Sequence, residues 1–433
     1  MPNDTVSSDA ASDHAGLSRR KLIGAASVGA LALGGIGAAQ AASNNSGHEG
    51  ANPSSVPVPF EGAHQAGIVT PAQDRLHLAV FDVTTESRDD VISLLKDWTA
   101  AARKATQGND IGTFGAVSGA PAAPPEDTGE ALGLPPSQLT LTIGFGPSFF
   151  EKNGKARFGL DGKKPDLLKT LPKFAGDQLR PEISDGDIVI QACANDPQVA
   201  VHAIRNLARI AFGRASVRYS QLGFGRTSST STSQSTARNL LGYKDGTANI
   251  KVEEKKDVNN FVWVHEGDGP EWLTGGSYLV TRKINMRIEI WDREPLEGQN
   301  TIIGRTKGSG GPMSGGDEFD KIDFKAEGTD GRPLVDHHSH VRLAHPDFNK
   351  GAKLLRRGYN FVDGSDGLGQ LSAGLFFIAY QRDPIKQFAQ VQQSLAGPTR
   401  DLLNEYIVHV SSGLFACPPG VGKTGFWGEG LFA

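Results

Sequence analysis

The order of the predicted strands and helices constrains this 433-residue chain most, because one order occurs twice. Apolar runs bounded by turn residues predict the strands, and the helical spacing of Val91, Leu94, Leu95 and Trp98 is typical of the helices. The first copy comprises strands at 76–83, 139–145, 187–194 and 215–223, with helices at 87–105 and 197–211. The second comprises strands at 276–283, 355–362, 373–382 and 406–416, with helices at 285–293 and 384–395.

Both copies have the order β-α-β-β-α-β, which is typical of a ferredoxin-like unit. They also share the turn before the second helix, Asp196-Pro197 and Asp383-Pro384, in which aspartate caps the helix and proline suits its first position. The sequence therefore predicts an α+β protein of two tandem ferredoxin-like domains with antiparallel sheets, at residues 67–240 and 241–433.

The first 42 residues have the features of a bacterial export signal. Arg19-Arg20-Lys21 precedes a weakly apolar stretch of small residues that ends at an A-x-A cleavage site, Ala39-Gln40-Ala41. The paired arginines indicate the twin-arginine type, so we expect the twin-arginine translocase as a partner and an extracellular, periplasmic or envelope-associated protein. A membrane anchor is the alternative, although Ala and Gly contribute little to partitioning into hydrocarbon. Residues 43–66 are rich in Ser, Asn and Pro and predict a flexible linker.

Composition excludes several classes of protein. The net charge of -4 gives no basic footprint for a nucleic-acid partner. Cys193 and Cys417 are the only cysteines, so a Cys-rich zinc site or an iron–sulfur cluster is excluded. At most one disulfide can form, and two buried, unpaired thiols are the simpler expectation.

Two low-complexity segments are predicted to be loops. Residues 227–236 (TSSTSTSQST) are expected to form a solvated connection between the two copies. Residues 308–316 (GSGGPMSGG) lack the Lys-Ser/Thr ending of a P-loop, which argues against nucleotide binding there.

Three further segments carry candidate chemistry. In GYKDGTAN (242–249), two glycines bracket Asp245, which suggests a tight turn that presents one carboxylate, although an Asp-Gly turn can also be purely structural. In DHHSHVRLAHP (336–346), four histidines fall close together and could bind a transition metal, with an exposed polar turn as the alternative. His338 and His340 could also chelate zinc as an H-x-H pair.

The third segment, LLRRGY (354–359), runs from an apolar strand into Arg356 and Arg357. Successive side chains of a strand point to opposite faces, so one arginine can face a buried cleft while the other points away from it. A pair of surface arginines is the alternative.

Taken together and in this order, the three segments resemble those of the dye-decolourising peroxidases, and the predicted signal peptide resembles that of the exported, twin-arginine-dependent branch. GYKDGTAN is similar to the GxxDG signature of that family, SHVRLAHP to its haem-ligand segment, and LLRRGY to its distal-arginine strand. The similarity extends from about Gly67 to the C-terminus.

The resemblance implies one haem b per chain, held in a cavity of the C-terminal domain with His340 as the axial ligand of the iron. It implies that a carboxylate accepts the other ring N–H of that histidine, for which Glu405 is the candidate. Asp245 and Arg356 would lie on the opposite face as catalytic residues, and Arg342 and Arg305 are candidate partners of the haem propionates.

The implied activity is reduction of hydrogen peroxide with oxidation of dyes, phenolics or other small one-electron donors. Bulky donors would pass electrons through surface aromatic residues, for which Tyr380, Tyr406, Trp263 and Trp291 are candidates, with packing in the core as the alternative for each. Two alternatives stay open: release of iron from haem (a deferrochelatase) or ferrous iron oxidation for an iron-transport system, and a non-catalytic haem- or metal-binding protein.

Overall fold

The computed structural model describes residues 53–396 and 400–433. The predicted signal peptide and the first part of the predicted linker lie outside the described residues. Among the residues that are described, no helix has the length and apolar character needed to cross a membrane.

The first copy of the predicted order is confirmed in the N-terminal half. Its elements are β1 (Arg75–Val83), α1 (Arg88–Ala105), β2 (Thr140–Phe145), β5 (Ile188–Ala194), α3 (Pro197–Ile210) and β6 (Ala215–Arg226). Between them lie α2 (Pro147–Phe150) and a small hairpin of β3 (Glu151–Lys152) and β4 (Lys155–Ala156). Asp196 caps α3 as predicted, since its carboxylate accepts from the backbone N–H of Gln198 at 2.7 Å.

The C-terminal half also has the four predicted strands, with three differences. Its strands are β7 (Ser277–Met286), β8 (Leu355–Arg356), β9 (Tyr359–Ser365), β10 (Leu371–Gln381) and β11 (Ile407–Cys417). Its helices are α4 (Lys255–Phe261), α5 (Ile288–Trp291), α6 (Leu296–Ile303), α7 (His340–Ala344) and α8 (Gln390–Ala396), the last preceded by a π-helical turn at Ile385–Ala389.

The differences have physical causes. The helix predicted at 285–293 is only α5, because β7 continues its ladder with β11 as far as Met286. The strand predicted at 355–362 is divided into β8 and β9 at Arg357-Gly358, where a Cβ on Gly358 would meet Thr227 Oγ1 at 2.8 Å. The helix predicted at 384–395 begins with a wider turn after Asp383, whose carboxylate accepts from the N–H groups of Ile385 and Lys386.

The strands of the two halves form one closed antiparallel sheet. Their order is β2-β5-β1-β6 in the first half and β9-β10-β7-β11 in the second. The halves are joined by the pairings β6–β9 and β11–β2, so the sheet closes into a barrel. The strands pair antiparallel as predicted, but the separate sheets predicted for the two domains are joined into one sheet.

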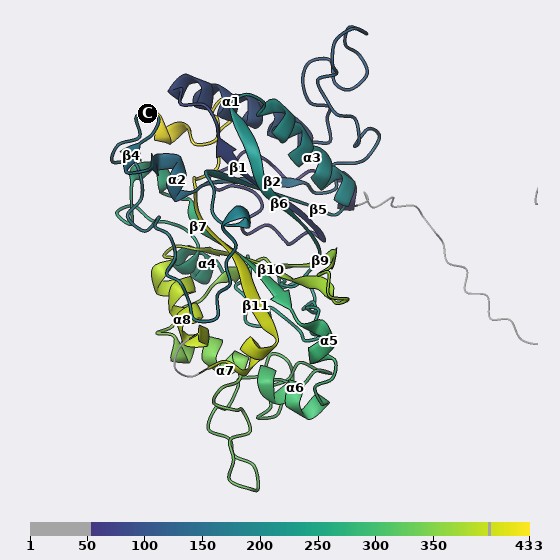
Figure 1. The fold of residues 1–433 in the computed structure, drawn as a ribbon, viewed down its shortest axis with the longest axis vertical. Coiled ribbons are helices and arrows are strands. Elements are labelled where there is room, and N and C mark those ends of the chain that lie inside the picture. The colour runs from purple at the N-terminus through teal and green to yellow at the C-terminus, as the bar shows by residue number, and fades with distance from the viewer. Residues whose placement is uncertain (1–52, 397–399) are drawn as a thin grey trace, which may run out of the picture. The chain divides into compact units, whose positions relative to one another are not determined.

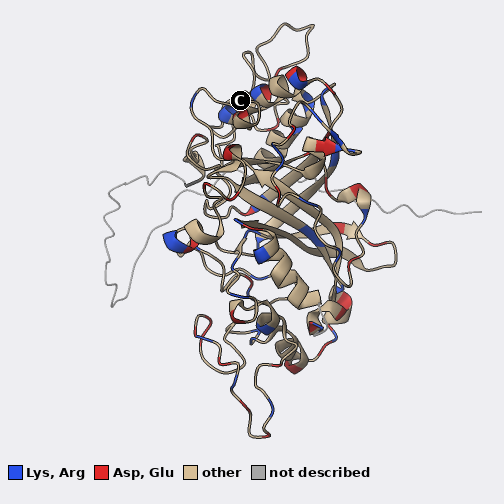
Figure 2. Cartoon of the chain, turned by 90° about the vertical axis from the view of Figure 1, so that its left-hand side faces the viewer, with Lys and Arg blue, Asp and Glu red and all other residues tan. Residues whose placement is uncertain are grey.

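Helices pack on the outside of this barrel, on two opposite sides. Figure 1 shows α1 and α3 together on one side and α5, α6, α7 and α8 on the other. Trp98 of α1 is completely buried, contacts Phe81 of β1 and donates through Nε1 to Leu207 O of α3 at 2.8 Å. Most strand residues are uncharged, and basic and acidic residues are interspersed over the helices and loops (Figure 2).

Two segments predicted to be flexible or solvated are packed instead. In the described part of the linker, Phe60 is buried, and the Gln65 side chain donates to Ile143 O and Pro418 O. Residues 227–231, which we call the Ser/Thr strap, are at most 4% exposed. The expectation of solvation was wrong because short hydroxyl side chains can satisfy buried backbone groups: Thr230 Oγ1 donates to Thr70 O, and Ser231 Oγ to Glu253. Cys193 and Cys417 are buried and unpaired, as expected.

Candidate active site

A cavity of about 450 Å³ opens among elements of the C-terminal half. It is lined by side chains of β7, α7, β8, β10, α8 and β11 and by the 239–248 and 318–322 loops. Much of the lining is apolar, with Leu241, Ile284, Leu375, Phe377 and Val391 among its residues. Four of the predicted site residues line it: Asp245, Arg305, His340 and Arg356.

His340 is the first residue of α7 and faces this cavity, with 35% of its side chain exposed. Its Nδ1 lies 2.7 Å from Asp401 Oδ2, and Asp401 is 1% exposed. The other oxygen of Asp401 accepts from Leu403 N–H at 2.9 Å and so caps the turn that leads into β11. Among the described residues, none hydrogen-bonds to His340 Nε2, which leaves this nitrogen for a ligand.

The charge of Asp401 also sets the protonation of His340. Burial alone would lower the pKa of this histidine, but the charge of Asp401 and its hydrogen bond outweigh burial and raise the pKa above its ordinary value. A buried carboxylate therefore both orients this imidazole and strengthens it as an electron donor.

The prediction for Glu405 was wrong, because Asp401 occupies the position that we expected Glu405 to take. Glu405 is exposed, and its backbone carbonyl, rather than its carboxylate, accepts from Arg287. The missed signal was local: an aspartate directly before Leu402-Leu403-Asn404-Glu405 has the pattern of a helix cap.

Asp245 and Arg356 lie together in the wall of the same cavity. Arg356 NH1 donates to Asp245 Oδ1 at 2.5 Å, and the two side chains are 28% and 14% exposed. Asn239 Nδ2 donates to the other carboxylate oxygen of Asp245 at 3.4 Å. The structure thus brings the predicted carboxylate and guanidinium into direct contact, although they are 111 residues apart in the sequence.

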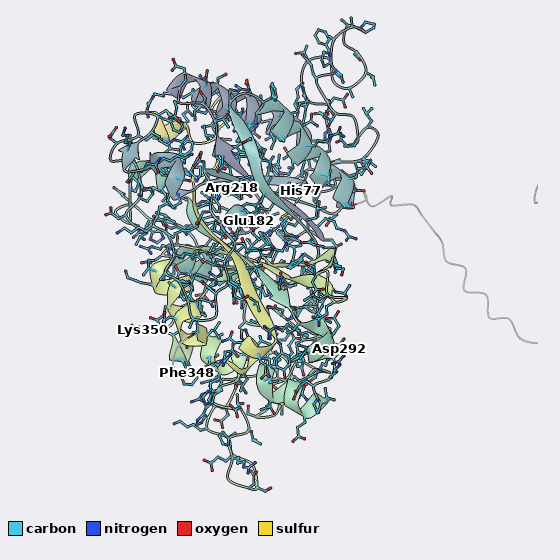
Figure 3. All side chains as sticks on the ribbon, viewed as in Figure 1. His77, Glu182, Arg218, Asp292, Phe348 and Lys350 are labelled. Atoms are coloured by element: carbon cyan, nitrogen blue, oxygen red, sulfur yellow. The ribbon has the colours of Figure 1, made fainter. Side chains whose placement is uncertain are left out.

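The two candidate propionate partners have different surroundings. Arg305 is buried and lines the cavity, and its NH1 donates to the carbonyls of Gly310 and Glu318. Burial lowers the pKa of Arg305. Arg342 does not line the cavity, because its guanidinium stacks 4.3 Å from the ring centre of Phe348, which Figure 3 labels. The structure therefore places the Arg342 guanidinium against Phe348 rather than in the cavity wall, and its role as a propionate partner stays a prediction.

The histidine cluster does not gather into a zinc site. His337 and His338 are exposed, whereas His340 and His345 line the cavity. In the part of the chain that is described, the one group of three potential metal ligands is Asp127, Glu130 and His202, in the N-terminal half. His202 Nε2 there lies 2.7 Å from Asp127, whose carboxylate also accepts from the N–H groups of Ile111 and Gly129.

Sequence reasoning missed a buried polar group at the cavity wall. Arg282 of β7 is 1% exposed, forms an ion pair with Asp177 and donates through Nε to His409 Nδ1 at 3.2 Å. Arg282 and His409 line the cavity. No motif marks these residues, because they come from two paired strands and a loop that are far apart in the sequence.

A series of edge-to-face aromatic contacts, which we call the aromatic stack, leads away from the cavity. Tyr243, which lines the cavity, contacts Trp291 at a centroid distance of 5.9 Å, and Trp291 contacts Tyr406 at 5.1 Å. Tyr406 Oη donates to Glu294 Oε2 at 2.9 Å. Of the other aromatic candidates, Tyr380 is buried within the barrel, and Trp263 stacks on His64 at 3.9 Å.

His409 should make the stability of the protein depend on pH. Burial, Arg282 and His340 lower its pKa to about 3. In the unfolded chain a histidine binds a proton below about 6.5, so the free energy of unfolding should fall as the pH falls from that value towards 3. Denaturant unfolding at several pH values should show a smaller fall for His409→Gln than for the wild type. Identical pH dependence in the two proteins would contradict this assignment.

Comparison with known proteins identifies the family. The family models for Dyp-type peroxidase, N-terminal, and Dyp-type peroxidase, C-terminal, match residues 65–225 and 236–422. A Yersinia pestis protein named deferrochelatase is 38% identical over 412 residues, which cover 93% of this chain and 92% of the relative.

Solved structures agree with these matches. Ferric DtpA from Streptomyces lividans is 37% identical with a TM-score of 0.79, covering 88% of this chain and 98% of that chain. A DyP-type peroxidase from Cellulomonas bogoriensis is 38% identical with a TM-score of 0.77, covering 88% and 99% of the two chains. With both family models matched over most of its length, this chain belongs to the Dyp-type peroxidase family.

Proposed function

We propose that this chain is an exported peroxidase that holds one haem b in the cavity around His340 and reduces hydrogen peroxide. The observation that carries the proposal is an imidazole, oriented by a buried carboxylate, in the same apolar cavity as a paired carboxylate and guanidinium. Small one-electron donors, such as dyes or phenolics, would supply the electrons.

The residues of the cavity fit a haem. An imidazole with one nitrogen bonded to a carboxylate and the other free is a common axial ligand of haem iron. Apolar side chains from several elements suit the faces of a tetrapyrrole, and Arg305 offers a cation for a propionate. When bound, the haem supplies an iron that peroxide oxidises by two electrons and that donors reduce in single-electron steps.

The chain's own residues would manage the protons and charges of peroxide. Asp245 would accept the proton of the oxygen that approaches the metal and return it to the departing oxygen, which leaves as water. Arg356 would stabilise negative charge on that departing oxygen while the O–O bond breaks. Their contact at 2.5 Å lets both act on one small molecule.

The domain organisation that we propose has four parts: a signal peptide (1–42), a linker (43–66) and ferredoxin-like halves at 67–240 and 241–433. The equivalent strand orders β2-β5-β1-β6 and β9-β10-β7-β11 support a duplicated unit. The boundary near residue 240 is supported by the two family models, of which the N-terminal one ends at residue 225 and the C-terminal one begins at residue 236. The twin-arginine motif supports export by the twin-arginine translocase.

The most direct test of function compares three variants loaded with haem. His340→Ala should lose the haem spectrum of the wild type, because it removes the axial nitrogen. Asp245→Asn and Arg356→Leu should keep that spectrum but react with peroxide about 100-fold or more slowly, the usual effect of removing a general acid–base or a charge-stabilising group. Stopped-flow absorbance measures both properties. A His340→Ala protein with the wild-type spectrum and peroxide reaction would refute the proposal.

Asp401 should strengthen the bond between His340 and iron. Asp401→Asn keeps the shape of the side chain but removes its charge, so haem affinity should fall about 10- to 100-fold, as for other residues that support a metal ligand. Glu405→Gln is the matched control, because the Glu405 carboxylate is exposed. Titration of the haem-free protein with haem measures both affinities. A weaker affinity in Glu405→Gln but not in Asp401→Asn would reverse the assignment.

Electrons from donors too large for the cavity would pass along Tyr406, Trp291 and Tyr243. Glu294 is placed to accept the phenolic proton when Tyr406 gives up an electron. Trp291→Phe should therefore slow turnover of a bulky dye several-fold and leave the reaction with peroxide unchanged. Trp263→Phe is the control, since Trp263 lies outside this stack. Equal dye turnover in both variants would exclude this path.

The name of the relatives, deferrochelatase, favours a second function, which is release of iron from haem. The released iron would pass to an iron-transport system. Incubation of the haem-loaded protein with a reductant, followed by separation of porphyrins, tests it. Iron-free protoporphyrin as a product would support this second function, and recovery of intact haem would exclude it.

A further inference from the structure

Arg356 lies in β8, a very short strand that pairs with another strand along one edge only. Strand β8 has two residues, and both pair with β10, Leu355 with Tyr380 and Arg356 with Ala379. Strand β9 continues along the same edge of β10 and pairs with β6 on its other side. However, β6 ends at Arg226, so β8 has no neighbouring strand on that side.

Asn249 takes the place of the missing strand. Its Oδ1 accepts from Arg356 N–H at 2.7 Å, and its Nδ2 donates to Arg356 O at 2.8 Å. One side-chain amide thus bonds both backbone groups of one residue, as a neighbouring strand does in a ladder. The second N–H of the amide donates to Ser229 O at 2.9 Å, and Asn249 is 4% exposed.

Asn249 also belongs to the loop that carries Asp245. Its backbone N–H donates to Gly246 O at 3.0 Å, directly after Asp245. Gly246 has φ +92 and packs against the Ser/Thr strap, where a Cβ would lie 3.0 Å from Ser228 Cα. The strap therefore supports the Asp245 loop on one side and, through Ser229, the amide that bonds Arg356.

We propose that Asn249 is a positioning residue that fixes the Arg356 backbone to the Asp245 loop and so sets the contact between the two side chains. This inference rests on the proposed peroxidase function. Asn249 acts through Arg356, because it does not line the cavity. Without its amide, β8 would be free to shift along its open edge, and the guanidinium would move relative to the carboxylate.

The test uses the full-length, haem-loaded protein with Asn249→Ala and Asn249→Asp. Both should keep the haem spectrum and affinity of the wild type but react with peroxide up to about 100-fold more slowly, the loss that follows a displacement of about 1 Å. Asn249→Asp retains an acceptor for Arg356 N–H but has no N–H for the carbonyls of Arg356 and Ser229. Asn206→Ala is the control, because Asn206 is fully buried in the N-terminal half and its side chain makes four hydrogen bonds, against three for Asn249.

A double-mutant cycle separates positioning from a general loss of stability. In the Arg356→Leu background, Asn249→Ala should slow the peroxide reaction no further. If Asn249→Ala slows the peroxide reaction by the same factor in both backgrounds, or reacts at the wild-type rate, the inference is overturned. If Arg356→Leu itself reacts at the wild-type rate, the catalytic role of Arg356 fails and the inference fails with it. If the haem-loaded wild type does not react with peroxide, the proposed function fails instead. Should Asn249→Ala not fold, Asn249→Asp carries the same cycle.

Discussion

The hydrogen bond between His340 and Asp401 is the contact on which the rest of the site depends. It joins the first residue of α7 to the segment that leads into β11, and it leaves Nε2 of the imidazole facing the cavity. Since Asp401 also caps the turn at 402–405, the same carboxylate orients the histidine and holds the turn that precedes β11. A change at Asp401 would therefore alter both the chemistry and one wall of the cavity.

The closed barrel explains how residues distant in sequence meet in this cavity. Each half contributes four strands in an equivalent order to the closed ring, β8 pairs with β10 in addition, and the halves join at β6–β9 and β11–β2. Where β6 ends, the chain continues as the Ser/Thr strap, and Arg356 lies beside this gap. The Arg356 guanidinium contacts Asp245, and at the opening in the ladder Asn249 provides the backbone bonds that a strand would have made.

Much of the fold could be predicted because apolar periodicity marks strands and helices that pack locally. Sequence alone predicts Arg356, Asp245 and His340 as candidate site residues, because each lies in a compact motif. Asp401 and Arg282 were missed because their roles arise from tertiary contacts with residues far away in the sequence. The polar composition of the Ser/Thr strap predicts a solvated loop, yet its hydroxyl and backbone groups find partners inside the protein.

The proposed function depends on the position of the haem iron relative to His340 Nε2. A crystal structure of the haem-loaded protein would measure the distance from iron to His340 Nε2 and show which face of the haem Asp245 and Arg356 occupy. We predict that His340 Nε2 lies within bonding distance of the iron, with Asp245 and Arg356 on the opposite face of the haem. Iron bound to His345 or another residue, or haem outside this cavity, would contradict it.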